Sequence, residues 1–254
     1  MDTAPTSWAN FIGLLEGMKT AGRKWKPWQL ERILRIAGDS GMAGIILEAA
    51  RSAARTGIVL ADVQVVREAF WGCRTKAVLE GWSEQGLESA VRYAEQFASL
   101  LEEERHAGRE RLGDGDPRVQ ADIIGVVLEL VAVKAEKFGQ GKSRDGMVRV
   151  YVERLVPHLE GVRALVMGDE KGSLAMKADH EMCRWVPVVS GLEAAGRVLG
   201  KEMPGAELVG KKIKELKRKL EEAREIVEES EEPEQVKGKR KGLHWWKALP
   251  SRSR

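Results

Sequence analysis

Two helix ends, 35 residues apart, constrain the fold of this chain more than any other feature. Each falls at a glycine that closely follows a basic residue: Gly22 after Lys19, and Gly57 after Arg55. Glycine ends a helix readily because it adopts the left-handed backbone conformation at little cost. A new amphipathic helix follows each end, and such a seam recurring at about 35 residues is typical of stacked helix hairpins. The pattern predicts an all-α protein, a right-handed α-solenoid of about four degenerate helix-hairpin repeats with a long charged C-terminal helix and a basic tail.

Apolar residues at three- and four-residue spacing place helices along most of the chain. They predict helices at about 8–22, 27–37, 42–55, 62–73, 83–101, 117–133, 147–159 and 177–199. Residues 148–152 alternate β-branched side chains and also fit a strand, but their context favours a helix. Pro187 predicts a bend in the last of these helices.

Six tryptophans precede the C-terminal region, and packing in the core or between repeats is the expected role for them because each buries a large area. They are Trp8, Trp25, Trp28, Trp71, Trp82 and Trp185. For Trp25 the alternative to core packing is contact at the protein surface, because Lys24 and Lys26 flank it in the sequence.

Composition changes sharply beyond Pro204, which predicts three parts: a helical-repeat domain at 1–203, a charged amphipathic helix at 204–232, and a flexible basic tail containing tryptophan at 233–254. The charged helix carries a narrow apolar seam with alternating steps of four and three. Its members are Val209, Ile213, Leu216, Leu220, Ala223 and Val227. Because the seam is short for a stand-alone coiled coil, we expect it to dock on the last repeat.

Bulk composition narrows the class of protein. With 43% apolar and 32% charged residues, the chain of 254 residues is suited to a folded core. Cys73 and Cys183 are distant in sequence, which predicts a reducing compartment and two buried thiols without a disulfide framework. No run approaches the roughly 20 apolar residues of a membrane span. Residues 1–5 carry an acid and no arginine, which matches neither a secretory signal nor a transit peptide.

The C-terminal tail concentrates positive charge. Residues 237–254 hold seven Lys or Arg and no acid, whereas the whole chain has a net charge of +3. Cations interleaved with aromatic rings attract phosphate and offer stacking surfaces, which indicates contact with RNA. The alternatives to RNA contact are docking of the Trp pair in a groove of a protein, a tail that only aids solubility, and a nuclear localisation patch. The candidate contact residues are Lys237, Lys239, Arg240, Lys241, His244, Trp245, Trp246 and Lys247.

Over about residues 8–160, these joints resemble those of the pentatricopeptide repeat family, with the related tetratricopeptide repeats as runner-up. A third joint, Gly108 before Pro117, extends the pattern at irregular spacing. The resemblance implies RNA association, and similar proteins of fungal mitochondria serve gene expression there, often at the ribosome. Members read RNA through polar side chains near the start of the first helix of each repeat. The corresponding residues here are Ile33, Val66 and Ile123, whose aliphatic side chains favour a scaffold over sequence-specific reading.

Motifs for catalysis or cofactor binding are incomplete. Residues 139–143 end like a phosphate-binding loop, but the position of the required earlier glycine is Glu136. His180 and Cys183 lack the further ligands of a zinc site. Asp114 and Asp116 fit a turn better than a calcium loop.

Taken together, the sequence predicts a non-enzymatic, RNA-associated scaffold in mitochondrial gene expression, without a cofactor, a metal, a membrane or a small-molecule substrate. Its expected partners are ribosomal or messenger RNA and protein subunits of a larger complex, and its expected location is the mitochondrial matrix. A protein–protein adaptor of the cytoplasm or nucleus is the alternative.

Overall fold

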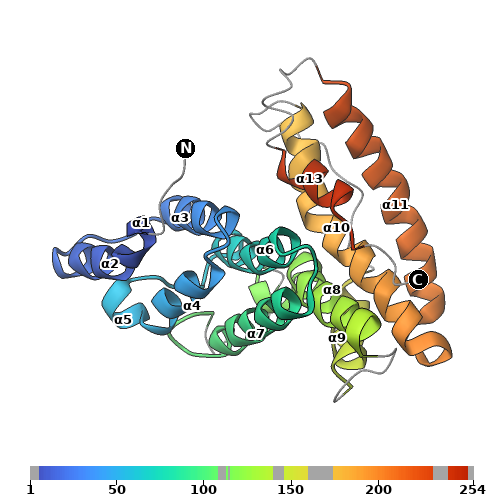
Figure 1. Cartoon of the computed structure of the whole chain (residues 1–254), viewed down its shortest axis with the longest axis horizontal. Helices are drawn as coiled ribbons and strands as arrows, with labels where there is room; N and C mark the ends of the chain where they lie inside the picture. The colour runs from blue at the N-terminus through green and yellow to red at the C-terminus, as the bar shows by residue number, and fades with distance from the viewer. Residues whose placement is uncertain are drawn as a thin grey trace. The chain divides into compact units, whose positions relative to one another are not determined.

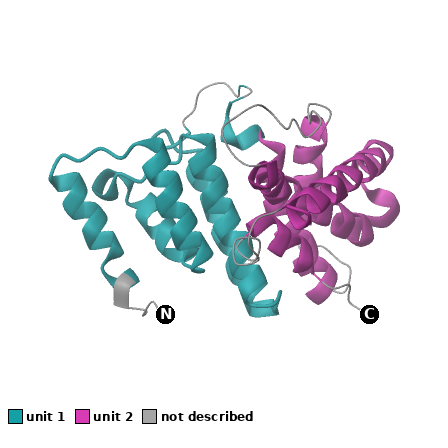
Figure 2. Cartoon of the chain, turned by 90° about the horizontal axis from the view of Figure 1, so that it is seen from above, with its two compact units in different colours: residues 1–119 teal, residues 120–254 magenta. Residues whose placement is uncertain are grey.

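The computed structural model describes residues 6–107, 113, 115–139, 146–159, 174–230 and 240–250. These residues form helices joined by turns, with no strand among them, as the predicted all-α class requires (Figure 1). The chain divides into two compact units, residues 1–119 and 120–254 (Figure 2).

Unit 1 contains seven α-helices and one short 3-10 helix among its described residues. They are α1 (Thr6–Ala9), α2 (Phe11–Thr20), α3 (Pro27–Asp39), α4 (Ala43–Arg51), α5 (Ala53–Thr56), α6 (Val63–Leu79), α7 (Glu84–Leu101) and η1 (Pro117–Val119).

Local signals in the sequence determine several of these helix ends. Gly57 caps α5 with a φ of 76°, the left-handed conformation predicted for it. Pro27 opens α3 at its first position, where a missing N–H costs nothing. Asp62 caps α6, because its carboxylate accepts hydrogen bonds from the N–H groups of Gln64 and Val65 at 2.8 and 3.3 Å.

The core of unit 1 is built on two helix pairs. α3 packs on α6, and α4 packs on α7. The backbones of α3 and α6 approach closely where Gly38 faces Gly72, since a Cβ atom on Gly38 would lie 3.0 Å from the Cα of Gly72. Glycine is required on both sides of this crossing because a larger residue would push the helices apart.

Unit 2 is organised around one long helix. Its elements are α8 (Ala121–Phe138), α9 (Met147–Leu159), α10 (Leu174–Leu199), η3 (Gly200–Glu202), α11 (Ala206–Glu228) and α13 (Lys241–Lys247). α10 contacts each of the other elements and contains Pro187 without ending there. α9 confirms a helix where residues 148–152 also fitted a strand.

The charged helix α11 docks by its apolar seam. Val209, Leu216, Leu220, Ala223 and Val227 are buried, and α11 packs along α10. This confirms docking over a stand-alone coiled coil. The compact units divide between residues 119 and 120. Beyond the composition change at Pro204, α11 belongs to unit 2 because its seam packs on α10.

Two sequence expectations about single elements are corrected. The helix expected at 42–55 is two helices, interrupted at Ser52. Trp28 is exposed, although it was expected in the core. Trp71, Trp82 and Trp185 are buried as expected. Trp8 and Trp25 are partly buried.

Several expected features lie outside the described residues, namely Gly108, Asp114, most of the 139–143 loop, Lys237 and Lys239. Where the structure is described, no helix combines the length and apolarity that crossing a membrane requires. The same residues contain no group of His, Cys, Asp or Glu placed to hold a metal ion.

Candidate nucleic-acid interface

The described part of the basic tail is a helix. Residues 241–247 form α13, which lies against α10 in Figure 1. The sequence predicted a flexible tail from residue 233, but α13 buries Gly242, Leu243 and Trp245. Burial of the Leu243 and Trp245 side chains holds this stretch on the body of unit 2.

Asp179 on α10 anchors the first turn of α13. Its Oδ1 atom accepts a hydrogen bond from the backbone N–H of Leu243 at 3.0 Å. Burial raises the pKa of the Asp179 carboxyl, and the Leu243 hydrogen bond and the nearby charge of Arg240 partly offset that rise. The contact is close, because a Cβ atom on Gly242 would clash with the backbone oxygen of Asp179 and lie 2.6 Å from the Cβ of Met182.

Trp245 is an anchor and not a stacking platform. Its side chain is 1% exposed, and the Lys241 ammonium lies 5.9 Å from the ring centroid. A nucleotide base cannot stack on a ring that is buried this deeply. In this conformation Trp245 therefore contributes to RNA contact only by holding α13 in place, which corrects the interpretation of an exposed Trp pair.

The remaining predicted contact residues of α13 reach solvent to different degrees. His244 and Lys247 are exposed, whereas Arg240, Lys241 and Trp246 are partly buried. The ammonium of Lys247 lies 3.3 Å from Glu228 Oε1 at the end of α11. α13 thus presents a small, basic and partly aromatic surface rather than an open strand.

The start of α11 adds positive charge. Lys211 and Lys214 are exposed and form no ion pair within the described residues. Lys212 and Lys219 instead pair with Glu215 at 3.1 and 2.7 Å and lower its pKa. Lys214 lies about 21 Å from Glu228 along the axis of α11, at a rise of 1.5 Å per residue. The exposed Lys211 and Lys214 are therefore distant from the ion pair that Lys247 forms with Glu228.

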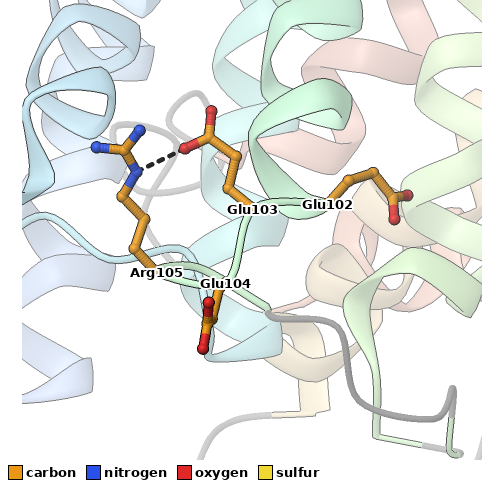
Figure 3. Close-up of a pocket in the computed structure, with 4 residues that line it drawn as sticks. All are labelled: Glu102, Glu103, Glu104 and Arg105. Atoms are coloured by element: carbon orange, nitrogen blue, oxygen red, sulfur yellow. Dashed lines mark hydrogen bonds and ion pairs between the residues drawn. The ribbon is translucent and has the colours of Figure 1, made fainter.

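Unit 1 contains a pocket of opposite charge. Glu102, Glu103, Glu104 and Arg105 line a surface hollow of about 560 Å³ (Figure 3). Arg105 Nε donates to Glu103 Oε2 at 2.5 Å, and the Glu102 and Glu104 side chains point away from that pair. The lining carries three carboxylates and one guanidinium, and an excess of negative charge repels phosphate, so this pocket is not a candidate RNA site.

Other proposed sites are not assembled. Cys73 and Cys183 are both buried and are not joined in a disulfide, and burial raises the pKa of the Cys73 thiol, which makes it unreactive. The positions that the repeat resemblance would assign to RNA reading are aliphatic; Val66 and Ile123 are buried and Ile33 is half-buried. Aliphatic side chains offer no hydrogen bonds to a base.

Sequence reasoning missed Asp179 as the anchor of α13 and Trp28 as a surface residue. Only the contact between α10 and α13, which are far apart in sequence, identifies Asp179. Trp28 had a local signal: it lies two positions before the buried Leu30, which turns it about 200° away on a helix.

Comparisons with known proteins agree with a helical ribonucleoprotein component. The family model for mitochondrial ribosomal protein mS27 matches residues 1–248. The small ribosomal subunit protein mS27 of Neurospora crassa is 31% identical over 182 residues, which cover 68% of this chain and 46% of that protein. The chain therefore spans about half the length of this relative. Because the family model covers nearly the whole chain, the protein belongs to the mitochondrial ribosomal protein mS27 family.

Proposed function

We propose that this protein is a non-enzymatic scaffold of the small subunit of the mitochondrial ribosome, where it contacts ribosomal RNA and neighbouring subunit proteins. The observation that carries the proposal is the match of the mS27 family model to residues 1–248. The name of the Neurospora relative, a small ribosomal subunit protein, supports the choice of subunit. Membership of this family favours the mitochondrial matrix over the cytoplasmic or nuclear adaptor.

A repeat-type scaffold is part of this proposal. In unit 1 the first helices of two successive hairpins, α3 and α6, pack together, and so do the second helices, α4 and α7. Helix-hairpin repeats stack in this way, each contacting its neighbours in sequence. The relation to pentatricopeptide repeats remains a proposal that this packing supports.

Contact with RNA through the tail is the second part. The exposed Lys247, with Lys237 and Lys239 a few residues earlier in the sequence, concentrates positive charge on one short stretch, which also contains the exposed His244. Each cation that neutralises a phosphate releases a counterion, so such binding weakens as salt rises. Arg240, Lys241 and Trp246 lie in the same stretch of sequence, and the buried Trp245 holds α13 on unit 2.

Sedimentation tests the assignment to the ribosome. The tagged full chain, expressed in mitochondria, should migrate with the small subunit in a sucrose gradient of mitochondrial lysate. Nuclease digestion of the RNA should shift it to lighter fractions. Migration with free proteins before digestion would contradict the proposal.

A matched pair of variants tests the tail. Changing Lys237, Lys239 and Lys247 together to Gln should weaken RNA binding and reduce the slope of log affinity against log salt by about two to three. Changing Arg51, Arg92 and Arg154 to Gln removes the same charge from exposed positions elsewhere and should leave that slope nearly unchanged. Equal effects of the two sets would show that net charge, and not the tail, governs binding.

A further inference from the structure

We infer that unit 1 carries a separate RNA-binding surface at the joint between α2 and α3, which stacks an unpaired base on Trp28 and holds the adjacent phosphates. We name it the Trp28 surface; it consists of Arg23, Lys24, Lys26, Trp28 and Arg32. The inference rests on the proposed ribosomal function for the identity of the RNA, but it does not depend on the tail.

Trp28 is unusual among the tryptophans of this chain. Its side chain is 58% exposed, whereas every other tryptophan within the described residues is buried or partly buried. Leu30, Leu34 and Ala37 form the buried face of α3, and Trp28 points away from them. An exposed indole offers a large flat apolar face, so Trp28 is a candidate contact for a partner.

Basic residues flank this indole in the sequence, and the carboxylate that also lies one turn away, Glu31, is paired with Arg35. Arg23, Lys24 and Lys26 are exposed in the turn before α3, and Arg32 is exposed one turn after Trp28. None of these four forms an ion pair within the part of the chain that the structure describes. Residues four apart on a helix are neighbours, which brings Arg32 beside the ring.

Arg35, one turn further along α3, is different. Its Nη1 atom lies 3.1 Å from Glu31 Oε1 and 3.9 Å from Glu68 Oε1. The positive charge available to a ligand on this helix therefore ends at Arg32.

Trp25 makes the joint rigid. Its Nε1–H donates to the backbone oxygen of Thr56 at 3.2 Å, and its ring packs on Gly57, where a Cβ atom would lie 3.1 Å from Trp25 Cδ1. This contact holds the backbone between Lys24 and Lys26, so their side chains start from a fixed position. A ligand then loses less conformational freedom on binding than it would on a mobile loop.

This chemistry fits unpaired RNA. An aromatic face with flanking cations binds single strands because each base has a π-face and each phosphate a charge. In a duplex the bases stack on one another and are not free to cover Trp28. The occupant that we infer is a loop or single-stranded segment of RNA, and an acidic protein segment is the competing outcome of the test.

The test uses the full chain, an unstructured oligonucleotide of about 12 nucleotides and a hairpin duplex of equal charge, with binding followed by fluorescence anisotropy. Trp28→Ala should weaken binding of the unstructured RNA about tenfold, and Trp28→Phe should restore part of it. Leu79→Ala is the matched control, since Leu79 is 60% exposed in the same unit and should have no effect. Each variant is measured with the native tail and with the Lys237, Lys239 and Lys247 substitutions, so that tail binding does not mask the result.

The charge of Arg32 provides a second measurement. Arg32→Gln should reduce the salt slope by about one, whereas Arg92→Gln, at an exposed position of α7, should not. If Trp28→Ala and Leu79→Ala behave alike, or if Trp28→Ala weakens duplex binding equally, the inference is wrong.

Crosslinking separates this inference from the proposed function. A photoreactive residue at position 28 should crosslink to RNA in small subunits isolated from mitochondria. Crosslinks to protein alone, in a chain that sediments with the subunit, would overturn the Trp28 surface and leave the ribosomal assignment intact. A chain that fails to sediment with the subunit would overturn that assignment, and the oligonucleotide measurements would still decide whether the surface binds RNA.

Discussion

At the scale of single residues, His106 makes the stability of unit 1 depend on pH. The imidazole is buried, and its Nδ1 atom accepts a hydrogen bond from the backbone N–H of Leu60 at 3.1 Å. Burial lowers the pKa of His106 below its usual 6.5, and Arg105 adds to this while Glu103 opposes it. The folded protein therefore favours the neutral form, whose contribution to stability is present above pH 6.5 and is lost as the pH falls through the lowered pKa.

His106→Ala should lower the free energy of unfolding by about 1–3 kcal/mol at pH 7.5, because the N–H of Leu60 loses its buried acceptor. Toward pH 5 the difference from the native chain should shrink, since protonation also removes the acceptor in the native chain. Urea unfolding at several pH values measures both effects. His244→Ala, at an exposed position, is the control and should change stability by less than about 0.5 kcal/mol. A difference that stays constant with pH would contradict this role for His106.

Asp179 should show the opposite dependence on pH. Because burial raises its folded pKa above 3.8, the protonated form stabilises the fold below about pH 3.8, and this contribution is lost as the pH rises through the raised value. Asp179→Asn keeps an oxygen acceptor for Leu243 without the buried charge. We expect this variant to be at least as stable as the native chain at pH 7, with the advantage disappearing in acid.

Asp179→Leu separates the hydrogen bond from the charge. It leaves the buried N–H of Leu243 unpaired and should cost about 1–3 kcal/mol at neutral pH. Unfolding curves for the two variants give the comparison. Equal stability of the Asn and Leu variants would show that the Leu243 hydrogen bond does not hold α13.

At the scale of elements, the docking of α13 depends on Gly242. Gly242→Ala should displace α13, because the added methyl group would clash with the Asp179 backbone. Trp245 would then be exposed, and we expect a red shift of tryptophan emission and earlier cleavage by protease near residue 240. Gly210→Ala is the control: nothing lies within 4 Å of its Cβ position on α11, so it should stabilise that helix by about 0.5–1 kcal/mol. Native emission and cleavage in Gly242→Ala would contradict the close packing.

The sequence predicted those helix ends whose signals are local. Asp62, Pro27 and Gly57 act within a few residues, so their types and positions were sufficient. Whether α13 is buried or exposed could be decided only from the surface of α10 on which it packs. Trp245 in α13 is buried because α10 lies opposite it, which its neighbouring sequence does not reveal, whereas the exposure of Trp28 follows from its place opposite Leu30 on α3.

At the scale of the whole molecule, positive charge is local. Residues 237–254 hold seven Lys or Arg and no acid, while Glu102, Glu103 and Glu104 gather at one pocket of unit 1. Glu104→Gln should therefore leave RNA affinity unchanged or slightly raise it, because it removes a repulsive charge. Anisotropy with the same oligonucleotide measures this, and a weakened affinity would place RNA contact at the pocket instead.

The sequence by itself determined the helical class, the helix ends with local caps and the apolar seam of α11, because each depends on the periodicity or chemistry of neighbouring residues. The tertiary structure decided the division at residues 119 and 120, the anchoring of α13 by Asp179 and the burial of Trp245. These features arise from contacts between helices that are distant in the chain. The free energy that stabilises these contacts comes from the fit between two packed surfaces. The residue pattern of one segment describes only one of those surfaces.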